Sequence, residues 1–171
     1  MKVANPLKYI LIFTSLCIVA LMTITMPESD ASNQKSLTFP LYNRGASTFY
    51  IKARLGGLQK TELMLDTGSG YMTINEDTLG KLKQQGEVSF VKNIGGILAN
   101  GSKLVVPVWR IRHIKLGSKC ELYDVDAAIF PGKTRQILGL SALKKAGPLT
   151  LSFNPPQITL NHCMGSTKDT L

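Results

Sequence analysis

Leu63-Met64-Leu65-Asp66-Thr67-Gly68-Ser69 is the segment that decides the fold of this chain. Its apolar start, residues 63–65, predicts a strand that delivers a carboxylate directly into a tight turn. Gly68 allows a close backbone approach and a φ that a side chain would resist. The hydroxyl groups of Thr67 and Ser69 can hydrogen-bond to neighbouring backbone groups or to the carboxylate. Because Asp and Gly are also common turn formers, the segment alone is compatible with an ordinary strand-to-turn junction.

Two more motifs follow along the chain. Residues 137–143 predict a buried apolar strand that ends at Gly139 and continues into a short helix, which Ser141 is able to cap. Between the two motifs, residues 93–102 form a Gly-rich stretch in which Asn100-Gly101 is a strong signal for a hairpin turn.

Together these three segments resemble the retropepsin-like (clan AA) single-domain aspartic proteases. In that family an apolar strand runs into D-T-G-[S/A], a β-hairpin flap follows, and an apolar-apolar-Gly segment leads into a helix. The resemblance covers roughly residues 47–160 and is closest to bacterial, membrane-anchored members. It implies an all-β, retropepsin-like acid-protease barrel with one short helix, a polypeptide substrate, and no metal or organic cofactor.

The resemblance also implies a role for each motif. The active-site loop would consist of the catalytic residue Asp66 followed by Thr67, Gly68 and Ser69. The substrate flap would comprise Gly95, Gly96, Asn100 and Gly101, with the first two glycines providing its bend. The support beneath the active-site loop would come from Ile137, Leu138 and Gly139.

The expected chemistry requires two carboxyl groups. Hydrolysis of an amide by water needs one group that takes a proton from the water and one that gives a proton to the carbonyl oxygen. Two carboxyls that share a single proton can fill both roles. The chain offers one such aspartate, so the second is expected from another copy, giving a pair of Asp66 side chains in a homodimer. The alternative is a catalytically silent peptide-binding or adaptor module, which would hold extended peptides by strand addition and needs no second copy.

An almost uncharged run, residues 9–26, lies near the N-terminus, with Lys2 and Lys8 before it and Glu28 and Asp30 after it. Its 18 residues are just enough to cross a bilayer. The charge asymmetry favours a cytoplasmic N-terminus and an exported remainder. We therefore expect an uncleaved signal anchor, with a cleavable signal peptide as the alternative, because small residues follow the run.

The expected organisation has five parts. They are a cytoplasmic N-terminus (1–8), a transmembrane signal anchor (9–26), a polar tether (27–37), the protease domain (38–163) and a flexible tail (164–171). The protease domain is expected in the periplasm or otherwise outside the cytoplasm, where its substrates would be envelope or membrane-proximal proteins.

The periodicity of the domain is that of strands. The predicted strands are residues 49–55, 58–65, 104–116, 122–130, 149–153 and 158–160. Residues 76–85 form either a short helix or a turn-rich loop. Many short strands favour an all-β, barrel-like domain.

Charge, histidines and cysteines narrow the function further. The chain has 20 Lys and Arg against 11 Asp and Glu, but they are scattered. They predict a solvated basic face that could lie near anionic lipid headgroups, and no nucleic-acid partner is expected. His113 and His162 belong to no H-E-x-x-H array, which leaves a zinc hydrolase without support.

Cys120 and Cys163 could form a disulfide outside the cytoplasm, although nothing in the sequence shows whether they lie close together.

Overall fold

The computed structural model describes residues 36–97 and 101–163. The predicted N-terminus (1–8), the signal anchor (9–26), nearly all of the tether (27–37), Asn100 of the flap and the tail (164–171) lie outside the described residues. Within the described ranges, no helix has both the length and the apolar character needed to cross a bilayer.

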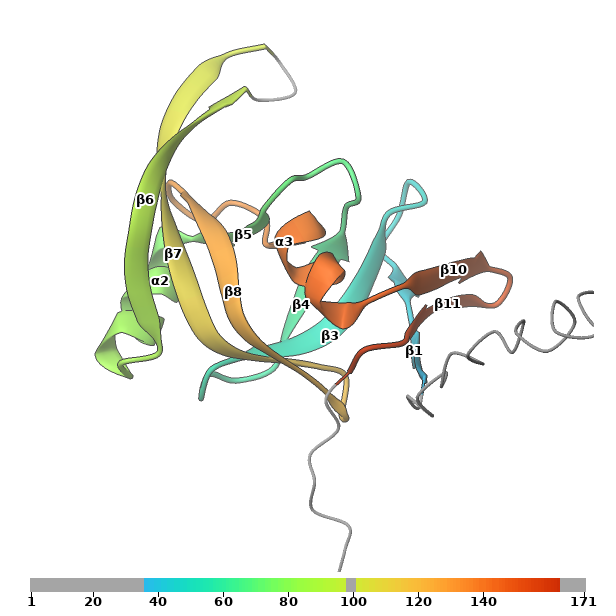
Figure 1. Ribbon diagram of the computed structural model, residues 1–171. Coiled ribbons are helices and arrows are strands. Elements are labelled where there is room, and N and C mark those ends of the chain that lie inside the picture. The colour runs from blue at the N-terminus through green and yellow to red at the C-terminus, as the bar shows by residue number, and fades with distance from the viewer. Residues whose placement is uncertain (1–35, 98–100, 164–171) are drawn as a thin grey trace, which may run out of the picture. The chain divides into compact units, whose positions relative to one another are not determined.

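The described chain is mostly β-structure (Figure 1). Its strands are β1 (Leu37–Pro40), β2 (Tyr42–Asn43), β3 (Phe49–Leu55), β4 (Thr61–Leu65), β5 (Met72–Asn75), β6 (Val88–Ile97), β7 (Lys103–Leu116), β8 (Cys120–Phe130), β9 (Ile137–Leu138), β10 (Leu149–Phe153) and β11 (Pro156–Leu160). Its helices are α2 (Glu76–Gln84), the one-turn α3 (Leu140–Leu143) and the 3-10 turn η1 (Lys144–Ala146).

Eight strands form one sheet in the order β2-β3-β4-β9-β5-β8-β7-β6. β3 pairs with β7 as well as with β4, so the sheet closes on itself as a barrel. In a smaller sheet, β1-β11-β10, the first described strand pairs with the last one. The sequence analysis expects an all-β, barrel-like domain, and the described residues confirm a mostly-β, barrel-like fold.

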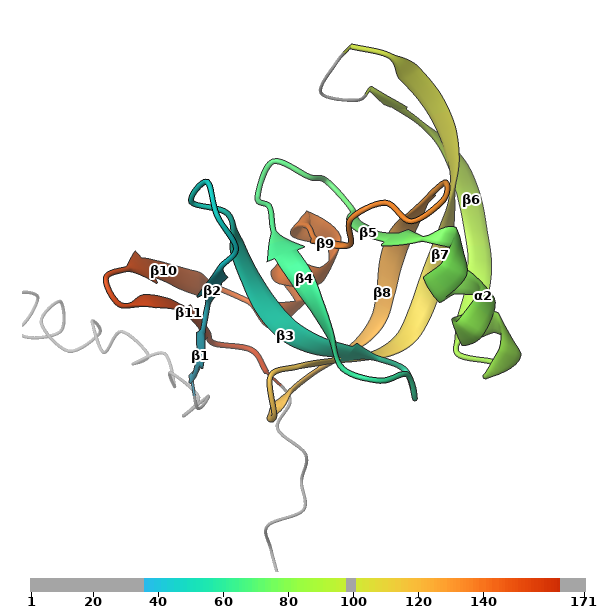
Figure 2. The same cartoon turned by 180° about the vertical axis from the view of Figure 1, so that it is seen from behind.

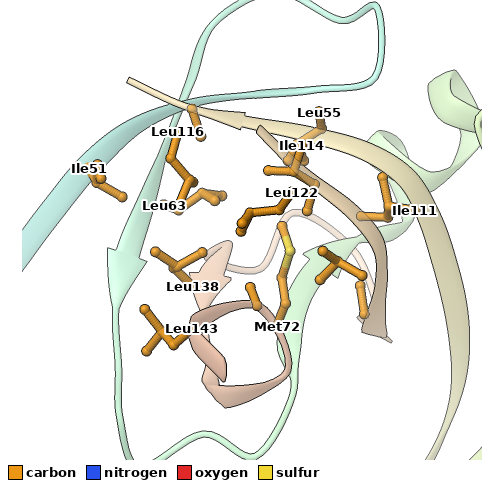
Figure 3. Packing of buried hydrophobic residues seen from close by; sticks show 14 of the residues in the cluster. Ile51, Leu55, Leu63, Met72, Ile111, Ile114, Leu116, Leu122, Leu138 and Leu143 are labelled. Carbon is orange, nitrogen blue, oxygen red and sulfur yellow. The ribbon is translucent and has the colours of Figure 1, made fainter. Parts of the chain in front are cut away.

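Alternating polarity explains why these segments are strands with one face on the core. In β3, Ile51, Ala53 and Leu55 are buried, whereas Lys52 and Arg54 are exposed. Most buried residues of the large sheet meet those of α3 in the main apolar cluster (Figure 3). Its largest fully buried members include Ile51, Leu55, Leu63, Met72, Ile111, Ile114, Leu116, Leu138 and Leu143. Val106, Val108 and Ala128 form a second, smaller cluster.

The sequence leaves a short helix and a loop as alternatives for residues 76–85, and the structure shows the helix. It is α2, which covers Glu76–Gln84. The side chain of Asn75 caps the helix, since its Oδ1 accepts a hydrogen bond from the Thr78 backbone N–H at 2.9 Å. The buried residues of α2 are Thr78, Leu79 and Leu82, which attach it to the barrel.

Cys120 and Cys163 form a disulfide, with their Cα atoms 4.7 Å apart. Cys120 begins β8 in the large sheet, and Cys163 follows β11 of the smaller one. The bond therefore ties the C-terminal end of the described domain to the barrel.

Candidate active site

Asp66 comes directly after β4, at the place where three strands meet. β9 pairs parallel to β4 through Leu138 and Leu65, and antiparallel to β5 through Ile137 and Thr73. Because β9 lies between β4 and β5, residues 66–71 have to cross over the end of β9 to connect them (Figure 2). This crossing carries the residues that the sequence analysis expects in the active-site loop, and the name active-site loop is kept for residues 66–71.

One hydrogen bond within the loop holds the carboxylate of Asp66, and another ties its backbone to β9. The backbone N–H of Gly68 donates to its Oδ1 at 2.8 Å, and the backbone N–H of Asp66 donates to the carbonyl oxygen of Leu138 at 3.3 Å. Among the described residues, Oδ2 has no hydrogen-bond partner. Asp66 is half-buried, while Thr67 and Gly68 are exposed. One carboxylate oxygen is thus held by the loop, and the other is available to a ligand or a second chain.

The loop and helix α3 hold each other through backbone hydrogen bonds. The N–H of Leu140 donates to the Ser69 carbonyl at 2.8 Å, and the N–H of Ser141 donates to the Gly70 carbonyl at 3.1 Å. These are N–H groups at the start of the helix, which no residue within a helix can satisfy. The active-site loop itself therefore caps α3.

Ser141 has a different role from the one expected. Its side chain makes no cap, and the N-cap residue is Gly139. Instead, its Oγ accepts a hydrogen bond from the Met72 backbone N–H and donates one to the Asp126 carbonyl, both at 2.7 Å. Ser141 thus fastens α3 to β5 and β8 beside the active-site loop.

Gly139 lies where no side chain fits. A Cβ atom at this position would overlap the carbonyl oxygen of Tyr71 and lie 2.9 Å from that of Ser69. Both obstacles are backbone atoms of the active-site loop, so they cannot swing aside as a flexible side chain could.

Replacing Gly139 with alanine is therefore expected to lower the free energy of unfolding by about 2–3 kcal/mol. The matched control is Gly80→Ala, at an exposed position of α2 with nothing within 4 Å of the added Cβ. The control should raise the free energy of unfolding by up to about 1 kcal/mol, because alanine favours helix. Urea unfolding of both variants, followed by the fluorescence of Trp109, measures the difference. Equal stability of Gly139→Ala and the wild type would show that the loop does not pack against Gly139 in this way.

The loop forms one wall of a cleft of about 590 Å³. Asp66 is the one acidic residue among its lining residues in the described part of the chain. The lining residues are Asp66, Gly68, Ser69, Thr73, Ile97, Phe130, Thr134, Arg135 and Ile137. The cleft therefore combines a carboxylate, apolar walls and one cation.

The β6–β7 hairpin reaches over this cleft. Its outer end extends beyond the barrel and curves toward the side on which the active-site loop lies (Figures 1 and 2). Ile97, at the end of β6, is 75% exposed and lines the cleft together with Asp66. The hairpin thus lies at the cleft, where the sequence analysis expects the substrate flap.

The other predicted site residues lie in the β6–β7 hairpin and in β9 beneath the active-site loop. Gly95 and Gly96 lie inside β6, opposite Val105 and Leu104, so they belong to the strand and not to the turn. Gly101 has a φ of +81° and precedes β7. Ile137 lines the cleft and Leu138 is fully buried beneath the loop.

Five residues of the site were not predicted in their observed roles. Thr73, Phe130, Thr134 and Arg135 line the cleft, and Ser141 fastens α3 beside it. Arg135 follows a turn, where a lone cation ordinarily indicates only a solvated surface. For Phe130, its place at the end of a predicted strand was an available signal.

Comparisons with known proteins agree with this geometry. A family model described as gag-polyprotein putative aspartyl protease matches residues 51–145, more than half of the chain's 171 residues. Among the curated proteins, none matches the sequence significantly. A solved structure of a retropepsin-like aspartic protease from Rickettsia conorii is 18% identical, with a TM-score of 0.52 over 74% of this chain and 98% of that chain. At this identity, that likeness concerns the fold.

The family match spans the segments from which the site is built: the Asp66 loop, the β6–β7 hairpin and β9. Family, fold and site therefore agree, and the chain belongs to the gag-polyprotein putative aspartyl protease family, as a retropepsin-like aspartic endopeptidase.

Proposed function

We propose that the protein is a membrane-tethered aspartic endopeptidase whose active site forms between two copies of the chain. The observation that carries this proposal is the half-site: among the described residues lining the cleft, Asp66 is the sole carboxylate. Hydrolysis through a shared proton needs two carboxyls, so the second comes from Asp66 of the partner.

In the assembled site, one Asp66 carboxyl is ionised and the other carries the shared proton. The ionised group takes a proton from a water molecule, whose oxygen attacks the carbonyl carbon of the peptide bond. The protonated group gives its proton to the carbonyl oxygen, which forms a tetrahedral diol. The carboxyl that took the proton from water then gives it to the nitrogen, the other carboxyl takes a proton from one hydroxyl, and the C–N bond breaks to release the amine and the new carboxyl group. The Gly68 N–H holds one oxygen of each carboxyl during these steps.

The rest of the site suits an extended polypeptide. Ile97, Phe130 and Ile137 offer apolar walls for side chains on either side of the scissile bond. The β6–β7 hairpin would close over the substrate and exclude water. The exposed Thr67 of each loop would brace the pair across the two-fold axis.

Self-association gives a direct prediction. Specific activity should fall when the chain is diluted and rise when two copies are joined in tandem, because dilution separates the pair and a linker raises its effective concentration. The measurement is the cleavage rate per chain over a concentration series, with sedimentation of the same samples. A constant rate per chain from a sedimenting monomer would contradict the half-site.

We also place the protease domain outside the cytoplasm, anchored through residues 9–26. Two observations support this location: the charge asymmetry that begins with Lys2 and Lys8, and the disulfide between Cys120 and Cys163, since disulfides persist in oxidising compartments. The substrates would then be envelope or membrane-proximal proteins.

Reporter fusions test this location. A reporter that functions only after export, fused after Leu171, should be active, because the anchor would carry the C-terminal side across the membrane. A reporter that functions only in the cytoplasm should be silent at the same position. The reverse pattern would place enzyme and substrate in the cytoplasm.

A further inference from the structure

A second pocket, of about 380 Å³, lies at the other end of β4 from the active site. Lys60, which lines it, comes immediately before β4, whereas Asp66 comes immediately after it. The rise of a strand places these two residues roughly 20 Å apart. The pocket and the catalytic cleft share no lining residue, so they are separate sites.

The lining of this pocket is strongly basic. Lys52, Arg54, Lys60 and Lys115 contribute to it, and none of its described lining residues is acidic. Phe39 and Pro40 of β1 add an apolar wall. Such a combination suits a ligand that has an anionic group next to an apolar part.

Two carboxylates beside these cations, Glu62 and Glu121, are already held in hydrogen bonds. Glu62 is opposite Lys52 in the β3–β4 ladder, but its Oε2 accepts a hydrogen bond from Arg44 at 3.0 Å. Glu121 accepts one from the Lys115 ammonium, also at 3.0 Å. Hydrogen bonds from Lys115 and the Tyr123 hydroxyl hold the pKa of Glu121 below its ordinary value, so it stays ionised and bound to them.

Arg54 and Lys60 therefore carry charges that nothing in the described chain neutralises. Lys115, directly opposite Arg54 across the β3–β7 ladder, is paired with Glu121. Arg54 and Lys60 thus remain as unpaired cations next to the apolar wall of Phe39 and Pro40. One bound anion could neutralise both, which is the argument that the pocket is a ligand site.

We infer that this pocket binds the headgroup of an anionic phospholipid, and so holds the barrel with its catalytic cleft directed away from the bilayer. The inference rests on the membrane tether proposed above. β1, the first described strand, forms the pocket's apolar wall, so the chain enters the domain beside the pocket. An anionic membrane surface also attracts Lys and Arg residues held close to it.

The test uses the full chain in an uncharged detergent, with bound lipid measured by native mass spectrometry. Phosphatidylglycerol should be retained at least about fivefold more than phosphatidylcholine. Arg54→Gln with Lys60→Gln should abolish most of that preference. The control, Lys144→Gln with Lys145→Gln, removes the same charge from exposed positions of η1 and should leave the preference unchanged.

Two results would overturn the inference. One is undiminished phosphatidylglycerol preference in the Arg54 and Lys60 double variant, which would assign lipid retention to other parts of the chain. The other is displacement of the lipid by an equal concentration of glycerol phosphate, which would make the pocket a site for a small soluble phosphate.

A second measurement reports on orientation. In vesicles containing phosphatidylglycerol, Lys60 of the full chain should react with an amine reagent at least about fivefold more slowly than in phosphatidylcholine vesicles. Lys144 should react equally in both. If the export-dependent reporter is active but Lys60 is not protected, the lipid inference is wrong and the proposed tether still holds. If the cytoplasmic reporter is active instead, the proposed tether is wrong.

Discussion

Replacing Asp66 with asparagine is expected to lower kcat/KM for peptide cleavage at least about 10²-fold, because the variant loses general base and general acid together. The substitution replaces one carboxylate oxygen of the side chain with an NH2 group and changes no other heavy atom. Asparagine can still accept the hydrogen bond that the Gly68 N–H donates to Oδ1 in the native loop. The loop and the dimer should therefore persist, and the loss should appear in kcat.

The measurement is cleavage of a peptide library by the full chain, with wild type and variant compared side by side. Asp77→Asn, at an exposed position in the first turn of α2, is the matched control and should retain full activity. A rate for Asp66→Asn within about tenfold of the wild type would rule out the carboxyl pair. A wild type that binds peptides without cleaving them would favour a silent binding module.

Removing the disulfide should have the largest effect on stability. Replacing both Cys120 and Cys163 with alanine is expected to lower the free energy of unfolding by about 4 kcal/mol, because the bond closes a long loop in the unfolded chain. The two cysteines are 43 positions apart. Alanine is the appropriate replacement because Cys120 is fully buried, and a serine hydroxyl there would add a desolvation cost.

Urea unfolding of the double variant and of the wild type, each with and without a thiol reductant, measures this effect. The reductant should destabilise the wild type to the level of the variant and leave the variant unchanged. If the oxidised wild type and the double variant unfold at the same urea concentration, the bond either does not form or contributes nothing. That outcome would also remove one support for an extracytoplasmic location.

The strands that could be predicted from the sequence are those with one face on the core. Residues 49–55 and 149–153 coincide with β3 and β10, because alternation of polar and apolar side chains marks a half-buried strand directly. β7 and β8 extend the predicted ranges by only one or two residues.

Two strands that could not be predicted, β5 and β6, lack this alternation. Met72, Thr73 and Ile74 of β5 are all buried, because β5 lies between β8 and β9 inside the sheet. The alternation is missing from β6 for the opposite reason. None of its residues is buried, because the hairpin extends out of the barrel.

The same division applies to the site. The Asp66 loop is a local motif, so its sequence was enough to predict its place after a strand. The role of Ser141 depends on Met72 and Asp126, which are distant in sequence and come together only through the sheet. The disulfide likewise depends on the end of β11 reaching the start of β8, which the spacing of two cysteines does not reveal.

The central claim is that each chain supplies half of one active site, and mixing tests it most directly. Wild-type chain at fixed concentration is allowed to exchange with a ninefold excess of Asp66→Asn, and cleavage is measured. Random pairing would leave about one tenth of the wild-type chains in fully active pairs, so the rate should fall about tenfold. A rate unchanged by the excess variant would show that a single chain cleaves alone and would contradict the account.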